Sequence, residues 1–292
     1  MKKFFITVLT SLLLFSCATD RYDENDALVN NNVSKSASLK AISGSKQTEY
    51  DIFLIAGQSN TYFGLGYDPN IDTPDPDIFQ VGRNEFENNK IITATEPLHH
   101  YWLVKPSDRI GFGLTFAKNY KKNLLKPGRK VLLVPCGYAG SSILLWGKGT
   151  LLYNDAVERT LKALKDNPGS EIKGILWHQG EADALLPATY TPILDKFITD
   201  IRNDLGNSNL PIVLGGMVPY WVNLDILGLR RMQQENIKNT PRRLPRAAYA
   251  DPNIPFVISK PNNWFDDIHY DANGQRELGA RYFNQYKTLH TN

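Results

Sequence analysis

The sequence predicts an α/β domain in which helices cover both faces of a mostly parallel sheet. Two observations lead to this prediction. After about residue 50, short apolar runs bounded by turn residues alternate with longer amphipathic segments. Each apolar run is too short for a typical helix, whereas the longer segments carry apolar residues at helical spacing. Strands that alternate with helices are typical of parallel sheets covered on both faces.

The apolar runs predict five strands, at residues 50–56, 130–135, 173–177, 211–218 and 255–259. The amphipathic segments predict helices around residues 152–164, 190–205 and 278–286. Reactive side chains in such sheets gather at the carboxyl ends of the strands, so the residues that follow each predicted strand are the candidates for a catalytic role.

The composition is that of an ordinary globular protein. Of 292 residues, 42% are hydrophobic and 22% are charged, which excludes collagen, a coiled coil and a chain without a core. Lys and Arg number 33 against 30 Asp and Glu, and the net charge is +3. Because no basic stripe stands out, no nucleic-acid partner is expected.

The first residues read as an export signal. Lys2 and Lys3 precede an uncharged, mostly apolar run over residues 4–16, which is too short to span a bilayer. The run ends in Leu-Phe-Ser before Cys17 and resembles a bacterial lipobox, although its Phe is a departure. The alternative is an ordinary signal peptide with an incidental cysteine.

Three segments are therefore expected along the chain. Residues 1–16 form a lipoprotein signal peptide, residues 17–49 a lipidated Cys17 and a disordered tether, and residues 50–292 the folded domain. This predicts an extracytoplasmic protein anchored by lipid to a bacterial outer membrane, on its periplasmic side or at the cell surface. The second cysteine, Cys136, is expected to be a buried apolar residue, with a catalytic thiol as the alternative.

A candidate nucleophile follows the first predicted strand. Gly57-Gln58-Ser59-Asn60 combines a glycine that permits a tight turn with a serine leaving the sheet edge. A serine hydroxyl needs a base to take its proton before it can attack. Without such a base the same four residues would be only a turn or a helix N-cap.

A candidate base lies near the other end of the chain. Asp266 precedes His269 by three residues, so both could share one turn, with the carboxylate on one ring nitrogen and Ser59 facing the other. The competing interpretation is an N-capping cluster for the next helix, which applies to Asp267 and Asp271.

Two further segments follow predicted strands. One reads Trp177-His178-Gln179-Gly180-Glu181, and the other contains Gly140 followed by Ser-Ser-Ile. Acyl transfer needs donors directed at the developing oxyanion, which a side-chain amide and a backbone N–H can supply. Gln179 and Gly140 have the required groups, although the same segments could be a polar strand end and a glycine-rich connection.

Together these blocks resemble the SGNH (GDSL-like) hydrolases. They are most similar to carbohydrate esterase family six and the sialate O-acetylesterase domain group. The order of the blocks matches, and the similarity extends over about residues 50–286. The resemblance implies a three-layer α/β/α sandwich and metal-free ester hydrolysis. The chain departs from the family pattern at Thr61-Tyr62-Phe63 and at Ala139, which puts the substrate in doubt more than the chemistry.

The resemblance also implies a role for each matching residue. Ser59 would be the nucleophile, His269 the general base and Asp266 its orienting acid. The oxyanion hole would combine the N–H groups of Ser59 and Gly140 with the Gln179 amide. Gln58, Asn60 and Glu181 are expected to support the site, and Glu181 could instead share the acid role with Asp266.

The expected function is removal of O-acetyl groups from a carbohydrate, as in acetylxylan esterases. A sialate O-acetylesterase and an inactive glycan-binding lipoprotein are the alternatives. The partners are then an acetylated oligo- or polysaccharide and the membrane, and the sequence indicates no oligomeric state. The resemblance implies that no cofactor is needed. A metal at His99 and His100 is not expected either, because adjacent histidines point apart in a strand and no third ligand is suitably spaced.

Overall fold

A computed structural model describes residues 47–98, 100, 108–258, 261–263 and 266–290. These residues belong to one compact unit, residues 45–292. The expected signal peptide, Cys17 and most of the expected tether lie outside the described residues. No helix in the described part of the chain is both long enough and apolar enough to cross a bilayer.

A seven-stranded sheet forms the centre of the described unit, and its strand order is β4-β3-β6-β1-β7-β8-β9. All neighbouring strands are parallel except β4, which pairs with β3 in the antiparallel direction. The strands are β1 (Glu49–Gly57), β3 (Ile78–Val81), β4 (Ile91–Thr93), β6 (Arg129–Pro135), β7 (Glu171–His178), β8 (Ile212–Gly215) and β9 (Ala247–Ala250).

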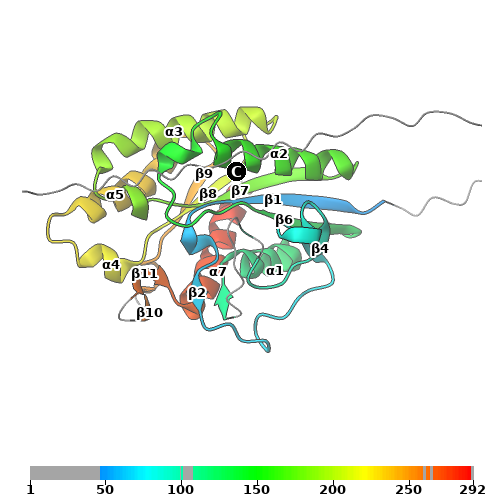
Figure 1. The fold of residues 1–292 in the computed structure, drawn as a ribbon, viewed down its shortest axis with the longest axis horizontal. Coiled ribbons are helices and arrows are strands. Elements are labelled where there is room, and N and C mark those ends of the chain that lie inside the picture. Colours follow the sequence, from blue (N-terminus) through cyan, green and yellow to red (C-terminus); the bar gives the residue numbers. More distant parts are fainter. Residues whose placement is uncertain (1–46, 99, 101–107, 259–260, 264–265, 291–292) are drawn as a thin grey trace, which may run out of the picture. The chain divides into compact units, whose positions relative to one another are not determined.

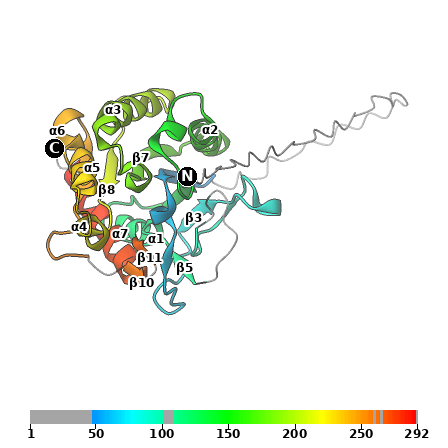
Figure 2. The same cartoon turned by 60° about the vertical axis from the view of Figure 1, so that its left-hand side comes forward.

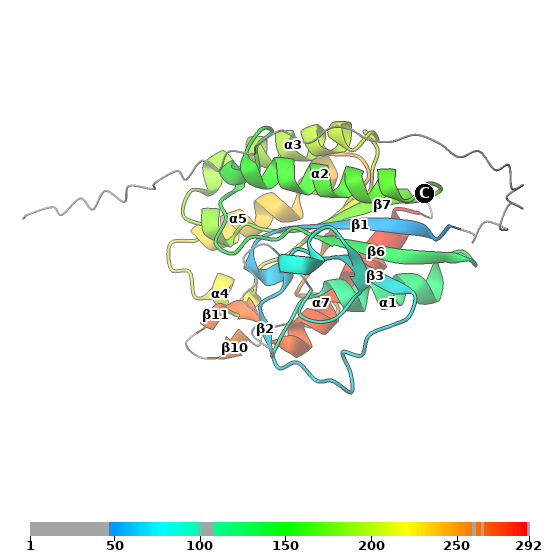
Figure 3. The same ribbon diagram turned by 45° about the vertical axis from the view of Figure 1, so that its right-hand side comes forward.

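Helices cover both faces of this sheet, as Figures 1 and 3 show. On one face lie α2 (Leu151–Asp166) and α3 (Pro187–Asp204), with α5 (Leu229–Lys238) packed against α3. On the other face α1 (Gly113–Asn123) packs against α7 (Ala272–Thr288). The architecture is therefore the expected three-layer α/β/α sandwich.

Short elements complete the described unit. Two small antiparallel sheets pair β2 (Gly64–Leu65) with β5 (Arg109–Ile110) and β10 (Pro261–Asn263) with β11 (Asp266–Tyr270). Figure 2 shows β10 and β11 near α7. The remaining helical segments are α4 (Pro219–Asn223), α6 (Thr240–Arg243), η1 (Ser59–Thr61), η2 (Glu85–Glu87), η3 (Ile143–Trp146) and η4 (Glu181–Asp183).

Aromatic side chains fill the core on both sides of the sheet. Phe53 of β1 meets Phe116 and Tyr120 of α1 edge-on, with ring centroids 5.0 and 4.8 Å apart. On the other face, Trp177 of β7 packs against Trp146 and Phe197 at 5.2 and 4.4 Å. Aromatic pairs at such separations stabilise a core beyond the area that they bury, so both helix layers are held firmly to the sheet.

Four of the five predicted strands are found, as β1, β6, β7 and β8, and the three predicted helices are α2, α3 and α7. The strand predicted at residues 255–259 is wrong over its described residues, because Phe256 and Val257 lie exposed outside any strand. The strand that follows β8 is instead β9. Its sequence, Ala-Ala-Tyr-Ala, consists mostly of alanine, whose small side chain and low β propensity give no recognisable strand pattern. The sheet also gains β3 and β4, which are only four and three residues long.

Candidate active site

The turn after β1 places Ser59 at the carboxyl edge of the sheet. Gly57 has φ 123°, and a Cβ there would lie 2.0 Å from the carbonyl oxygen of His178, so only glycine fits this close approach of β1 to β7. The Gln58 N–H then donates to that same carbonyl at 2.8 Å. Ser59 begins η1 directly afterwards and is 5% exposed. The glycine thus lets the chain turn sharply and bring Ser59 to the end of the strand.

Ser59, His269 and Asp266 form a continuous hydrogen-bonded chain. His269 Nε2 lies 2.7 Å from Ser59 Oγ, and His269 Nδ1 lies 2.6 Å from Asp266 Oδ1. Asp266 and His269 belong to strand β11 and not to the helical turn that their spacing predicted. The capping role falls to Asp271, whose Oδ1 accepts from the Gly274 N–H at 2.7 Å at the start of α7.

Asn60 joins the serine turn to the histidine strand. Its Nδ2 donates to the backbone carbonyl of Ile268 at 3.0 Å, and its Oδ1 accepts from the Tyr270 N–H at 3.1 Å. Its own carbonyl accepts from Gln275 Nε2 of α7 at 2.9 Å. Both backbone neighbours of His269 are therefore fixed to the residue that follows Ser59.

The carboxylate of Glu181 contacts Asn60 and His178, and not His269. Its Oε1 accepts from Asn60 Nδ2 at 2.6 Å and lies 3.2 Å from Nε2 of the buried His178. Burial alone raises the pKa of Glu181, but the adjacent His178 and the hydrogen bonds to it and Asn60 outweigh burial and lower that pKa. The carboxylate thus stays charged and fixes Asn60. Of the two carboxylates considered for the acid role, Asp266 is the one at His269.

Gln58 supports the adjacent turn. Its side chain is buried, and its Oε1 accepts from the Ala182 N–H at 3.3 Å. Its backbone carbonyl accepts from both the N–H and the Oγ1 of Thr61, at 3.0 and 2.7 Å. Gln58 therefore links the serine turn to η4.

The side chain of Gln179, predicted as an oxyanion donor, is buried and has several hydrogen-bond partners. Its Nε2 donates to the Ser141 carbonyl at 3.0 Å and to Asp183 Oδ2 at 2.5 Å, so both amide hydrogens are engaged. Its Oε1 accepts from Tyr190 Oη at 2.7 Å, and the residue is 1% exposed. Gln179 therefore holds the turn that contains Gly140 through its hydrogen bond to Ser141. The oxyanion roles of Gln179 and of the Ser59 and Gly140 N–H groups stay predictions.

Gly140 occupies an exposed turn with φ 67°, where a left-handed backbone favours glycine. Among the described residues, its N–H forms no backbone hydrogen bond. Asp183 holds the next part of this turn, since its carboxylate accepts from Ser142 Oγ at 2.5 Å and from the Ile143 N–H at 2.8 Å. The sequence left the role of Asp183 open, and its position four residues after Gln179 was the available signal.

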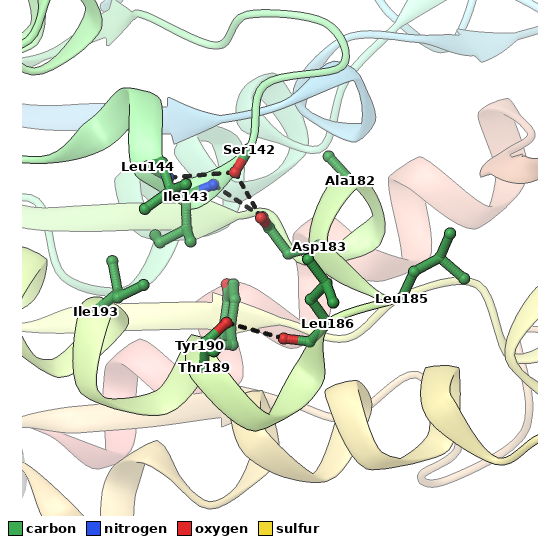
Figure 4. A pocket seen from close by; sticks show the side chains of 10 residues that line it. All are labelled: Ser142, Ile143, Leu144, Ala182, Asp183, Leu185, Leu186, Thr189, Tyr190 and Ile193. Carbon is green, nitrogen blue, oxygen red and sulfur yellow. Dashed lines mark hydrogen bonds between the residues drawn. The ribbon is translucent and has the colours of Figure 1, made fainter.

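A groove of about 550 Å³ lies beside this turn, and Figure 4 shows Asp183 on its polar wall. Most of its lining is apolar and comes from η3, η4 and the first turns of α3, including Leu144, Leu186 and Ile193. Ala182, on the rim, is the residue whose N–H reaches Gln58. One hydrogen bond therefore joins the lining of the groove to the serine turn.

The sequence assigned no role to Phe63, which lies beside His269, or to Arg109, which lies over Phe63. The Phe63 ring packs against the imidazole, with centroids 4.6 Å apart and planes at 45°. The guanidinium of Arg109 lies over the same Phe63 ring, with Cζ 3.7 Å from its centroid. The departure from the family pattern at Phe63 was the only sequence signal.

Other candidate residues have structural partners. Cys136 is buried, and burial raises its pKa to about 12, so it is a protonated core thiol. His100 is buried, accepts from the Gly137 N–H at 3.0 Å and stacks on Tyr62, while His99 lies outside the described residues. Within the ranges that the structure describes, no three His, Cys, Asp or Glu side chains are grouped to hold a metal ion.

Residues 49–288 match the family described as carbohydrate esterase, sialic acid-specific acetylesterase. The chain belongs to this family. By descent it is a carbohydrate esterase, which is a carboxylic ester hydrolase.

Two curated relatives show how the similarity is distributed. A probable carbohydrate esterase of Arabidopsis thaliana is 37% identical over 123 residues, which cover 41% of this chain and 46% of the relative. A probable 9-O-acetyl-N-acetylneuraminic acid deacetylase of Escherichia coli (strain K12) is 26% identical over 227 residues, which cover 59% of this chain and 68% of the relative. The match to the first relative thus spans less than half of its length.

Solved structures share the fold. The crystal structure of NanS aligns with a TM-score of 0.71 at 20% identity, covering 84% of this chain and 98% of that chain. The structure of the Arabidopsis thaliana protein has a TM-score of 0.66 at 25% identity, covering 82% and 98%. A carbohydrate acetylesterase from Xanthomonas citri has a TM-score of 0.60 at 19% identity, covering 82% and 56%.

Proposed function

We propose that this protein is a serine esterase that removes O-acetyl groups from a carbohydrate through an acetyl-Ser59 intermediate. The observation that carries the proposal is the chain of hydrogen bonds from Ser59 through His269 to Asp266, at 2.7 and 2.6 Å. A serine, a histidine and a carboxylate in this arrangement are the groups needed to activate a hydroxyl nucleophile.

In the first half-reaction, Ser59 Oγ attacks the acetyl carbonyl carbon while its proton moves to His269 Nε2. Asp266 accepts a hydrogen bond from His269 Nδ1–H and stabilises the imidazolium that forms. The carbonyl oxygen becomes an oxyanion, which the N–H groups of Ser59 and Gly140 stabilise. The tetrahedral intermediate then collapses. The bond to the sugar oxygen breaks, and His269 returns the proton to that oxygen.

In the second half-reaction, a water molecule attacks acetyl-Ser59. His269 takes a proton from the water, whose remaining hydroxyl bonds to the acetyl carbon and gives the second tetrahedral intermediate. As this intermediate collapses, the bond from its carbon to Ser59 Oγ breaks and His269 returns the proton to Ser59 Oγ. The product, acetic acid, gives its remaining proton to solvent and leaves as acetate. No group other than the residues of this chain and water takes part in the proposed cycle.

The substrate class that the comparisons favour is an O-acetylated sialic acid. The matching family is described as sialic acid-specific, and the E. coli relative is a probable 9-O-acetyl-N-acetylneuraminic acid deacetylase. Acetylated xylan, which the sequence favoured, is the second candidate and stays a prediction.

The test is acetate release from 9-O-acetyl-N-acetylneuraminic acid and from acetylated xylan, measured side by side with the Ser59→Ala variant as control. We expect release from the sialic acid, and we expect Ser59→Ala to lose almost all of kcat because the variant lacks the hydroxyl that His269 activates. Release by Ser59→Ala at the wild-type rate would reject the mechanism. A folded protein without activity on either substrate would favour the binding-protein alternative.

We further propose that Cys17 carries a lipid and anchors the domain outside the cytoplasm. Growth with a labelled fatty acid should label the full-length protein but not the Cys17→Ser variant. Equal labelling of both would reject the anchor without affecting the esterase proposal.

A further inference from the structure

We propose that Phe63 and Arg109 are positioning residues that hold the imidazole of His269 facing Ser59. This inference rests on the proposed function, because it assigns His269 the role of general base. It concerns residues of this chain at which the family motif gives no guidance.

Phe63 packs against the imidazole of His269. The phenyl ring lies 4.6 Å from the imidazole, centroid to centroid, at an angle of 45°. His269 is otherwise tied at two atoms, Nδ1 to Asp266 and Nε2 to Ser59. A ring packed against one face of the imidazole opposes rotation out of the plane that contains both bonds. Rotation of this kind would remove the base from the nucleophile.

Arg109 fixes Phe63 through two contacts. The guanidinium stacks over the phenyl ring at 3.7 Å, and its Nη1 donates to the backbone carbonyl of Phe63 at 2.7 Å. Arg109 therefore holds both the ring and the backbone of one residue. The pairing of β2 with β5, in which Leu65 faces Arg109, brings the two segments together.

This placement of Arg109 opposes folding, because it buries a hydrogen-bond donor without a partner among the described residues. Its Nε is buried and has no hydrogen-bond partner in the described part of the chain. Desolvation lowers its pKa, although Asp108 and Asp266 oppose this shift. A buried donor without a partner calls for an explanation, and support of Phe63 against His269 provides one.

The chain offers a matched control. Arg230 lies over the ring of Trp221, with Cζ 4.1 Å from the centroid, and its Nη1 donates to the Trp221 carbonyl at 2.9 Å. This pair repeats the geometry of Arg109 and Phe63, but it belongs to α5 and α4, and the aromatic ring beneath its guanidinium is that of Trp221 and not the ring that packs against His269. Arg230→Met therefore removes the same kind of stack elsewhere.

The experiment compares kcat and KM for acetate release by five variants of the full chain. We expect Phe63→Leu to lower kcat by about 10- to 100-fold with KM within about twofold, because a misplaced base slows the chemical step. Arg109→Met should lower kcat less, by several-fold, and Phe63→Leu with Arg109→Met should be no worse than Phe63→Leu alone. Phe63→Tyr, which keeps the ring, and Arg230→Met should keep kcat near the wild-type value.

Proton NMR of ¹⁵N-histidine-labelled protein gives a readout that does not depend on turnover. The Nδ1–H proton of His269 should be sharp in the wild type and in Phe63→Tyr, and broadened in Phe63→Leu. Thermal unfolding of each variant shows whether it remains folded. Unchanged kcat and an unchanged proton signal in folded Phe63→Leu would overturn the positioning role. An inactive wild type would overturn the proposed function, while the NMR comparison would still test the positioning role.

Discussion

Two carboxylates in the site, Asp266 and Glu181, have different partners and should have different functions. Asp266 meets His269 at 2.6 Å, whereas Glu181 holds Asn60 and lies beside His178. We expect Asp266→Asn to lower kcat by about 10⁴-fold, because an amide cannot orient the imidazole or stabilise its charge. Glu181→Gln should lower kcat much less. Steady-state kinetics of both variants tests this, and a larger loss in Glu181→Gln would transfer the acid role to Glu181.

Glu96 should make the stability of the protein depend on pH. Its carboxyl is buried, which raises its pKa to about 8, and hydrogen bonds from the Gly111 and Leu98 N–H groups only partly oppose that rise. The fold therefore favours the protonated form. Its contribution to stability is complete below the unfolded pKa, near 4.5, and is lost as the pH rises through about 8.

Thermal unfolding at pH 5 and pH 8 checks this expectation. Relative to Glu96→Gln, which is neutral at both values, the wild type should lose stability between them. An equal change in Tm for the two proteins would show that Glu96 does not titrate in this interval.

At the scale of elements, hydrogen bonds of Gln179 and Asp183 hold the turn between β6 and η3. Because the Gln179 amide is engaged by Ser141 and Asp183, we expect its removal to act by releasing the turn that carries Gly140. Gln179→Ala should therefore lower kcat by about 100-fold, as loss of an oxyanion donor does. Asp183→Ala should produce a comparable loss.

Kinetics of the two single variants and of the double variant separate the alternatives. A shared role in holding the turn predicts losses that are not additive. If Gln179 instead donated directly to the oxyanion, Asp183→Ala would retain most of the activity.

The sequence predicted best those elements in which consecutive residues are apolar. The strands β1, β6 and β7 are buried on both faces and therefore read as continuous apolar runs. The strand β9 is also buried, but its alanines carry no such signal, while the apolar Phe256 lies on the surface. Hydrophobicity alone does not distinguish these two cases.

The same reasoning applies to the site. Ser59 could be proposed because it lies in the short motif Gly57-Gln58-Ser59-Asn60, and Asp266 and His269 because they share a second one, with the acid three residues before the histidine. The bonds of Asn60 to Glu181 and to Ile268 could not, since they join residues 121 and 208 positions apart. Nor could the engagement of Gln179, which depends on where Ser141 and Tyr190 lie after folding.

At the scale of the whole molecule, the two ends of the chain should differ in importance. In α7, Leu278, Tyr282 and Tyr286 are fully buried, and Gln275 holds Asn60. Deleting residues 272–292 keeps Ser59, Asp266 and His269 but exposes this core, so we expect an unfolded and inactive protein. Deleting residues 1–44, which lie outside the compact unit, should leave kcat unchanged. Circular dichroism and acetate release test both truncations, and an active chain without α7 would contradict the expectation.

The distance along the chain between Ser59 and His269, 210 residues, also has a temporal consequence. A ribosome completes the serine long before it completes the histidine, and a serine hydroxyl without a base is inert. The nascent protein therefore carries no esterase activity for most of its synthesis. Reactivity arises only when β11 has brought His269 to Ser59, so a half-made chain does not hydrolyse the esters around it.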